Sequence, residues 1–407
     1  MKVTVGPQPL GSPVKKGRWV MDTVVHNPGL DGVVVGESAI CQIDETTGSL
    51  RYRGYGIEDL AEQATFEEVA FLLLHGELPS SRELHAWQVE LAHAASLPAV
   101  VRQFLETVPS SAHLMDVLRT GVSFLGMIDP EAQDVSHEAN LRKAIRLLAR
   151  IPLLLSWAIR ARYAQPLLQA RPTRSFAENL LYLLTGSLRT DHAKELEVSL
   201  NLYAEHELNA STFAGRVTAS TLAELYGAVT AAIATLKGPL HGGANEAVAE
   251  MFHAIREPNN AKAWVQTKLA GKERVMGFGH RVLKHEDPRG TIIKRRAMAL
   301  SQHMAYTPWY EIAEIIERTM KEEKGLLPNL DFYTAVIYLL MGIPIKAFTP
   351  IFVASRTAGW CAHIIEQQDH NRLIRPRASY IGSPMREFIC IYDRKDEDEH
   401  ANSPVSS

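Results

Sequence analysis

The stretch LAELYGAVTAAIATLKGPLHGGANE, residues 222–246, decides how the middle of this 407-residue chain folds. Its first half repeats apolar residues at intervals of three and four, the spacing of one buried helix face. These residues are Leu222, Leu225, Tyr226, Val229, Ile233 and Leu236. Pro239 cannot continue that helix, and the glycines on either side of His241 favour a turn. We therefore predict a core helix, a turn that carries His241, and a second helical run after it.

Helical spacing dominates the chain outside this stretch as well. Another apolar stripe ends before Gly76 and Pro79, and its residues are Phe66, Val69, Ala70, Leu73 and Leu74. Residues 33–43 and 50–55 differ, because they carry β-branched or alternating side chains on either side of the turn signal ETTGS at 45–49. No repeat of fixed period is present, which argues against an α-solenoid. The sequence predicts an all-α protein with one minor β-hairpin near its N-terminus.

The composition is that of a soluble globular protein, since 46% of the residues are hydrophobic and 22% are charged. A length of 407 residues fits two domains, or one large domain with an inserted one. The formal net charge of -3 provides no basic excess, so we do not expect a nucleic-acid partner. A few local arginines could still bind an anionic small molecule.

The chain carries no signal for a metal site, for export or for a membrane. Its three cysteines, Cys41, Cys361 and Cys390, have no C-x-x-C spacing, so neither a zinc site nor a disulfide framework is indicated. The N-terminal residues lack the apolar core of a secretory signal, and no run of about 18 apolar residues occurs. We expect a soluble, cytoplasmic protein with no membrane partner and no bound metal.

His241 is the first candidate for chemistry among sixteen histidines. A histidine in such a turn, close to a helix N-terminus, tends to stay neutral and can donate a hydrogen bond to a carbonyl oxygen. The alternative is a glycine-rich hinge between domains, in which the histidine has no role. Residues 238–246 by themselves leave both interpretations open.

Two later turns raise a similar choice. The segment RVMGFGH at 274–280, followed by DPR at 287–289, suits a phosphorylated or nucleotide-bearing ligand, and a surface loop is the alternative. It lacks the third glycine and the βαβ unit of a dinucleotide-binding fold. In PNLD at 328–331, Asp331 is either a helix N-cap or a carboxylate base whose proton affinity is raised by apolar neighbours.

Polar groups also gather in helical surroundings at two places. The segment YAEHELNAST, residues 203–212, fits either the lining of a cleft or a capped junction of helices. Arg356 lies inside the apolar run 352–360, and Arg375 precedes Pro376. An arginine in an apolar helix normally needs an anionic partner, and its planar group suits a carboxylate. That partner is either an Asp or Glu of the chain or a substrate.

Taken in order, the motifs GPLHGGANE, MGFGH with DPR, PNLD and IRPRASYIG resemble the citrate synthase family. The resemblance extends from about Gly29 to Gly382, which is most of the chain. It implies a mainly helical enzyme that works as a homodimer and needs no cofactor, because acyl-CoA is a substrate. On this basis we expect an N-terminal arm (1–30), a large domain (31–237 and 335–392), a small domain with the acyl-CoA and catalytic residues (238–334), and a flexible tail (393–407).

The resemblance also implies a role for individual residues. Asp331 resembles the general base that removes an α-proton from the acyl-CoA, and His241 the donor that stabilises the resulting enolate. His280 resembles the acid that protonates the carbonyl of oxaloacetate. Oxaloacetate is expected to be held by His206, Arg289 and Arg356, with Arg375 supplied by the partner subunit. The adenine of CoA is expected to bind the backbone of Arg274, Val275, Met276, Gly277 and Phe278.

Two positions indicate which acyl-CoA is used. Tyr203 stands where many citrate synthases have a histidine and Leu330 where they often have a valine, and in both respects the chain resembles 2-methylcitrate synthases. We therefore expect condensation of propionyl-CoA with oxaloacetate and water to 2-methylcitrate and CoA, in propionate catabolism. One methylene is worth only about 1–3 kcal/mol, so acetyl-CoA should also react. The alternative is a citrate synthase that uses mainly acetyl-CoA in the tricarboxylic acid cycle.

Other classes of protein fit less well. A citryl-CoA-cleaving lyase would use related residues, but we find no ATP-grasp or CoA-ligase region before this domain. A metal-dependent hydrolase would need a motif such as H-E-x-x-H, and His206 with Glu207 lacks the second histidine. A helical scaffold without activity would leave the three turns unexplained.

Overall fold

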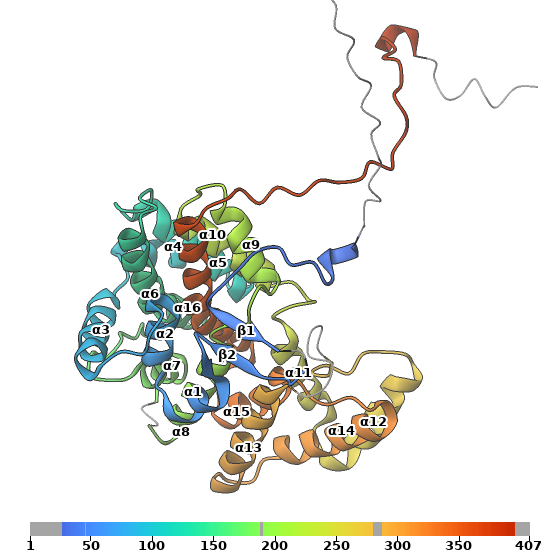
Figure 1. Ribbon diagram of the computed structural model, residues 1–407. Helices are drawn as coiled ribbons and strands as arrows, with labels where there is room; N and C mark the ends of the chain where they lie inside the picture. The colour runs from blue at the N-terminus through green and yellow to red at the C-terminus, as the bar shows by residue number, and fades with distance from the viewer. Residues whose placement is uncertain (1–26, 45, 188–189, 280–286, 395–407) are drawn as a thin grey trace, which may run out of the picture. The chain divides into compact units, whose positions relative to one another are not determined.

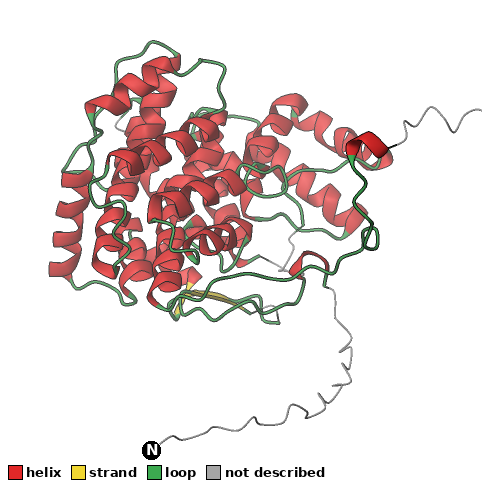
Figure 2. Ribbon diagram, turned by 90° about the horizontal axis from the view of Figure 1, so that it is seen from above, coloured by secondary structure: helices red, strands yellow, loops and turns green. Residues whose placement is uncertain are grey.

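The computed structural model describes residues 27–44, 46–187, 190–279 and 287–394 (Figure 1). Helices are the main regular structure of this part of the chain, and the strands are confined to one short sheet (Figure 2). The prediction of an all-α protein with a minor β-hairpin is therefore confirmed. No helix among the described residues is both long and apolar enough to cross a membrane.

The chain divides into two compact units, and the first one ends at Ala39. Its described part contains a single 3-10 turn, Pro28–Leu30. Residues 33–37, predicted to begin a strand, are exposed and form no strand. The reason is that β-branched side chains favour a strand only where one face can be buried.

The second unit begins with a three-stranded antiparallel sheet in the order β1 (Cys41–Ile43), β2 (Leu50–Tyr52), β3 (Tyr55–Gly56). Cys41 pairs with Tyr52 and Ile43 with Leu50, so the predicted hairpin forms around the turn between them. Leu50 and Tyr52 are buried and place one face of the sheet in the core. No further strand follows the sheet among the described residues.

The described residues form sixteen α-helices. Their bounds are α1 (Ile57–Gln63), α2 (Phe66–His75), α3 (Ser81–Ala94), α4 (Ala99–Thr107), α5 (Leu114–Ile128), α6 (His137–Arg162), α7 (Phe176–Thr185), α8 (Thr190–Tyr203), α9 (Ala210–Ala219), α10 (Leu225–Leu236), α11 (Ala244–Ile255), α12 (Pro258–Ala270), α13 (Pro288–His303), α14 (Trp309–Lys324), α15 (Leu330–Leu340) and α16 (Phe348–Asp369).

The two stripes predicted from apolar spacing form the buried faces of α2 and α10. α2 begins at a capping box, in which the side chains and backbone of Thr65 and Glu68 bond reciprocally, and it ends at Gly76 in the left-handed conformation. Leu222 is an error in the predicted stripe. It lies before the helix, at a positive φ of 64°, and is 58% exposed.

α16 is the helix around which the core is organised. It is buried along nearly its whole length and packs against α2, α6, α8, α9 and α10. A second group of contacts joins α11, α13 and α14 to α15, and α12 to α14. The helices α11–α15 appear together in Figure 1 as the yellow and orange segments. The proposed boundaries of a large and a small domain, 31–237 with 335–392 and 238–334, stay a prediction.

The chain after α16 has no helix or strand between Asp369 and a 3-10 turn at Ile391–Asp393. No residue from 371 to 394 is buried. This segment exposes large apolar side chains at Leu373, Tyr380, Ile381, Met385, Phe388, Ile389, Ile391 and Tyr392. Such a density of exposed apolar residues is unusual for a monomer and is typical of an interaction surface.

Candidate active site

Asp331 lies in the first turn of α15 and does not act as the N-cap of that helix. The cap is Asn329, whose side-chain oxygen accepts the backbone N–H of Asp331 at 3.1 Å. The structural alternative considered for Asp331 is therefore wrong. The Asp331 carboxylate is not needed to cap the helix, because Asn329 already caps it.

The Asp331 carboxylate has one strong partner, the hydroxyl of Tyr203 at the end of α8. Tyr203 Oη donates to Asp331 Oδ1 at 2.5 Å, and Tyr203 is only 2% exposed. Burial raises the pKa of Asp331 to about 6, although the hydrogen bond from Tyr203 and the positive charge of Arg289 act in the opposite direction. A carboxylate with a pKa near 6 is a stronger base than a solvated one and is still largely ionised at neutral pH.

His241 lies in the predicted turn between α10 and α11, and its ring is held from one side. Ser211 donates its backbone N–H to His241 Nε2 at 3.3 Å, and Ser211 Oγ lies 2.8 Å from the same nitrogen. A backbone N–H can only donate, so Nε2 is an acceptor and the ring proton is on Nδ1. Burial, together with the charge of Arg356, lowers the pKa of His241 to about 4. The ring is therefore a neutral donor at Nδ1.

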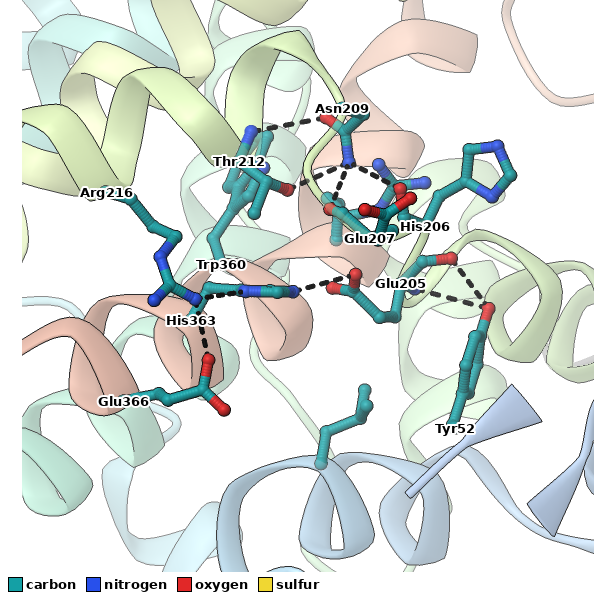
Figure 3. A network of polar contacts seen from close by, with 12 residues as sticks. Tyr52, Glu205, His206, Glu207, Asn209, Thr212, Arg216, Trp360, His363 and Glu366 are labelled. Carbon is teal, nitrogen blue, oxygen red and sulfur yellow. Dashed lines mark hydrogen bonds and ion pairs between the residues drawn. The ribbon is translucent and has the colours of Figure 1, made fainter. Parts of the chain in front are cut away.

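Ser211 is itself fixed from two directions. Trp360 Nε1 on α16 donates to Ser211 Oγ at 3.1 Å. Asn209, the N-cap of α9, accepts the backbone N–H groups of Ser211 and Thr212, and its Oδ1 lies 2.7 Å from Ser211 Oγ. Figure 3 shows Asn209 beside Thr212. The sequence analysis gave Ser211 and Trp360 no role, and the only signal for Ser211 was its place in the polar segment 203–212.

Three further candidates lie close to one another. Arg289 Nη2 lies 3.4 Å from His206 Nε2. Arg289 is buried and pairs with Asp287 at 2.8 Å, so its anionic partner belongs to the chain. Arg356 is also buried, but its Nε donates to the carbonyl oxygen of Tyr203 at 2.6 Å, and it has no ion pair with any described residue. Its terminal nitrogens therefore suit an anionic ligand.

The ring of Phe352 lies beside Tyr203, His241 and Arg356, and the sequence analysis did not identify this residue. Its ring packs against that of Tyr203 at 4.4 Å between centroids and lies 6.4 Å from that of His241. The guanidinium of Arg356 stacks on the same ring at 4.6 Å. Tyr203 thus contacts the carboxylate of Asp331 through its hydroxyl and Arg356 through its carbonyl oxygen. The Asp331 carboxylate, the neutral His241 ring and the Arg356 guanidinium are therefore linked through Tyr203 and Phe352.

The segment predicted to bind CoA lies beside the Asp331 turn. Asn329 donates its backbone N–H to the carbonyl oxygen of Gly277 at 2.9 Å and its side-chain N–H to that of Gly279 at 3.2 Å. Gly277 has a φ of +84°, and a Cβ there would lie 2.7 Å from the ring of Phe332. Only glycine fits this close approach. The loop and the first turn of α15 are therefore held together.

A cavity of about 260 Å³ opens next to the same turns. It is lined by residues from the ends of α5, α10, α11 and α16 and from the 274–279 loop, among them Met115, Lys237, Pro239, Gly243, Met276 and Thr349. A larger cavity, of about 320 Å³, lies among α4, α5 and α6 and contains none of the candidate site residues. The smaller cavity is the better candidate for part of a ligand site, because the candidate residues flank it.

Two predicted site residues are not brought into this group. His280 lies outside the described residues. Arg375 is exposed, and its only hydrogen-bond partner among the described residues is the carbonyl oxygen of Pro376, at 3.4 Å. Within the part of the chain that the structure describes, no three His, Cys, Asp or Glu residues are grouped so that they could hold a metal ion.

Comparison with known proteins identifies the family. The family model "Citrate synthase, C-terminal domain" matches residues 29–377, well over half of the chain. The chain belongs to the citrate synthase family. The recognition of a citrate synthase-like enzyme from its motifs is therefore confirmed, and so is its class as a condensing enzyme.

Similar citrate synthases and 2-methylcitrate synthases occur among bacteria. "Citrate synthase 2" of Bacillus subtilis (strain 168) is 45% identical over 90% of this chain and 98% of its own length. A "2-methylcitrate synthase" of Shewanella oneidensis is 43% identical over 90% of this chain and 97% of its own. The family therefore includes relatives of both activities at nearly the same distance, and sequence identity alone does not decide between the two acyl donors.

Solved citrate synthase structures share the fold. Citrate synthase from Thermotoga maritima MSB8 superimposes with a TM-score of 0.81 at 38% identity, covering 90% of this chain and 99% of that one. A citrate synthase from Thermoplasma acidophilum, in a ternary complex with carboxymethyl coenzyme A and oxaloacetate, gives a TM-score of 0.84 at 33% identity with the same coverage. The predicted citrate synthase-like fold is confirmed.

Proposed function

We propose that this chain condenses propionyl-CoA, and also acetyl-CoA, with oxaloacetate and water to give 2-methylcitrate or citrate and CoA. The observation that carries the proposal is the pairing of a buried base with a neutral donor, Asp331 and His241, around Phe352. The Thermoplasma acidophilum relative, which binds a CoA analogue together with oxaloacetate, supports the choice of substrates.

In the first step Asp331 takes an α-proton from the acyl-CoA. That proton is weakly acidic, and its removal leaves negative charge on the thioester oxygen. His241 donates its Nδ1–H to this oxygen. Its Nε2 accepts from Ser211, and this contact keeps the ring proton on Nδ1. A neutral imidazole suits this role because the donor is already protonated at neutral pH and needs no proton uptake.

In the second step the α-carbon of the enol bonds to the carbonyl carbon of oxaloacetate. Arg356, Arg289 and His206 hold the oxaloacetate carboxylates in this proposal, and His280 supplies the proton for the new hydroxyl group. Hydrolysis of the thioester by water then releases the tricarboxylate and CoA. The backbone of residues 274–278 receives the adenine of CoA, and no cofactor takes part.

The pH dependence of kcat follows from the direction in which Asp331 is shifted. Its pKa in the folded protein is raised to about 6, so the base is lost by protonation as the pH falls through that value. The hydrogen bond from Tyr203 lowers this pKa. Tyr203→Phe should therefore move the acid limb of the kcat profile to higher pH. Stopped assays of wild type and variant from pH 5 to pH 8 would measure it, and a limb that stays in place would refute the assigned base.

The choice of propionyl-CoA as the better substrate rests on Tyr203 and Leu330. Both are nearly fully buried, and Leu330 adjoins the base directly. We expect a kcat/KM for propionyl-CoA about tenfold above that for acetyl-CoA, within the range that one methylene allows. Steady-state CoA release with each donor at saturating oxaloacetate measures the ratio. A higher value with acetyl-CoA would favour the alternative, a citrate synthase of the tricarboxylic acid cycle.

We also propose a homodimer in which Arg375 reaches the oxaloacetate site of the partner subunit. The support is the segment from residue 371 to residue 394, which follows α16 and exposes eight large apolar side chains. A second copy of the chain would cover them. Propionate catabolism and a cytoplasmic location stay predictions from the sequence.

Subunit complementation tests the placing of Arg375. Arg375→Ala and Asp331→Asn homodimers should each be nearly inactive. In hybrids of the two, one site per dimer combines an intact Asp331 with an intact Arg375 of the partner, so a random mixture should regain about a quarter of wild-type activity. Co-expressed subunits with two different affinity tags would supply the hybrids. Activity no higher than the sum of the homodimers would show that both residues serve the same subunit.

A further inference from the structure

A chain of buried polar groups lies behind the oxaloacetate residues (Figure 3). Glu205, which directly precedes His206, has no exposed surface, and neither has His363 of α16. His363 Nε2 lies 3.0 Å from Glu205 Oε1. A buried carboxylate is costly unless it is hydrogen-bonded or paired, and His363 provides that partner for Glu205.

The hydrogen-bond donors of this chain can be assigned from geometry. Arg216 Nη1, which can only donate, lies 3.1 Å from His363 Nδ1. His363 Nδ1 is therefore an acceptor, and its Nε2–H donates to Glu205. Arg216 also pairs with Glu366 at 2.6 Å, toward the protein surface. The order from outside to inside is Glu366, Arg216, His363, Glu205.

One face of α16 contacts the segment before His206 at three successive positions. Arg356, Gly359 and His363 are three and four residues apart and so lie on the same side of the helix. Arg356 binds the carbonyl oxygen of Tyr203, and His363 binds the side chain of Glu205. Between them, a Cβ at Gly359 would overlap the carboxylate of Glu205 and the carbonyl oxygen of Ala204.

The backbone of the same segment is held from the opposite side by β2. Tyr52 donates its hydroxyl to the carbonyl oxygen of Glu205 at 2.8 Å. The chain then leaves the helical conformation, and Glu207 takes a positive φ of 52°. No helix fixes residues 204–209, so side-chain contacts such as these hold the backbone next to His206.

The charge of Glu205 also acts on Arg356. Burial lowers the pKa of the Arg356 guanidinium, and the nearby carboxylate of Glu205 opposes that shift more than any other charge does. Glu205 Oε2 has no hydrogen-bond partner among the described residues. The carboxylate therefore depends on the single donor His363 to keep its place.

We propose that Glu205 and His363 are positioning residues for the oxaloacetate site: His363 fixes the carboxylate of Glu205, and through it the orientation of His206 and the buried charge near Arg356. Neither residue touches a substrate. This inference rests on the proposed function, because it assigns His206 and Arg356 to oxaloacetate.

Two variants of His363 separate its two contacts. In His363→Gln the amide reaches the position of Nε2, so it can still donate to Glu205. In His363→Asn the shorter amide stays near the position of Nδ1, so it keeps Arg216 and leaves Glu205 without a donor. We expect His363→Asn to raise the KM for oxaloacetate about tenfold or more, and His363→Gln to stay within about threefold, since an unsatisfied buried charge is displaced or neutralised. The KM for acyl-CoA should stay nearly constant in both.

Glu205→Asp tests the same contact without changing His363. Its carboxylate is one methylene shorter and loses the donor, so the KM for oxaloacetate should rise as it does in His363→Asn. Glu366→Gln is the matched control, because it removes a charge at the outer end of the same chain and should leave this KM unchanged. Thermal unfolding of each variant would confirm that it is folded.

The failure of the inference and that of the proposed function are distinguishable. An unchanged KM for oxaloacetate in folded His363→Asn or Glu205→Asp would overturn the inference while the wild type stays active. An equal rise in Gln and Asn variants of His363 would overturn it too, because the donor to Glu205 would then not matter. A wild type that condenses no acyl-CoA with oxaloacetate would instead refute the proposed function.

Discussion

Asp331→Asn should lower kcat by about 10²–10⁴-fold, the range by which a positioned general base accelerates proton transfer. Asparagine has nearly the shape of aspartate and can still accept the hydrogen bond from Tyr203, so oxaloacetate should bind almost as tightly as in wild type. Initial rates of CoA release give kcat, and calorimetric titration with oxaloacetate gives the affinity.

A carboxylate in the same kind of position on another helix serves as the control for Asp331. Asp59 lies in the first turn of α1 and is exposed. Asp59→Asn should therefore retain full activity. If Asp331→Asn also kept wild-type kcat, another group would have to be the base, and the assignment that joins Asp331 to Tyr203 would be wrong.

His241→Ala should lower kcat by about 10²–10³-fold, as the loss of one preorganised donor to a developing oxyanion does. The KM for oxaloacetate should change little, because His241 is assigned to the thioester oxygen and not to the carboxylates. The same CoA-release assay over a range of both substrates separates kcat from the two KM values.

Two further substitutions help to interpret the loss of activity in His241→Ala: one should restore part of it, and the other is a control. His241→Asn places an amide N–H near the position of the imidazole Nδ1 and should recover part of the activity. His303→Ala removes an exposed histidine at the end of α13 and should have no effect. A His241→Ala enzyme with near wild-type kcat would show that the thioester oxygen is stabilised by another donor.

The helical fold could be predicted because its signals are local. Apolar spacing identified the buried faces of α2 and α10, and Gly76 marked the end of α2. The errors occurred where a local signal had no tertiary support. Residues 33–37 resemble a strand but have no buried face, and Leu222 matches the helical period but precedes the helix.

The site could be predicted as a set of residues but not as an arrangement. Resemblance to a family supplied Asp331 and His241, while the local pattern left each with a structural alternative. The structure favours the functional interpretation of Asp331 because Asn329 takes the cap, a choice that depends on the backbone geometry of one turn. No spacing rule relates Tyr203 to a carboxylate 128 positions away.

Tyr203 shows how the structure changed one interpretation. In the sequence it was a marker of acyl-CoA preference. In the structure it also donates to the carboxylate of Asp331 and supplies the carbonyl oxygen that binds Arg356. A substitution of this side chain would therefore alter proton transfer together with any preference, and wild-type substrate ratios are the cleaner test of specificity.

Ser211, Trp360 and Phe352 were not identified because their roles depend on contacts between distant segments. Trp360 reaches Ser211 across 149 positions, and Ser211 fixes His241 across 30. Ser211 had only its place in the polar segment 203–212 as a signal, and Phe352 and Trp360 lie in an apolar run that is typical of a core. Phe352 and Trp360 lie on α16, and their contacts with Tyr203 and Ser211 form only when the helices pack together.

The most direct test of the central claim is to identify the product. The purified chain should be incubated with propionyl-CoA and oxaloacetate, and free CoA and the organic acids should be quantified by mass spectrometry. The account predicts equimolar CoA and 2-methylcitrate, and citrate in place of 2-methylcitrate when acetyl-CoA is the donor, with no CoA released when oxaloacetate is omitted. Release of CoA and propionate without oxaloacetate, or no reaction with either donor, would contradict it.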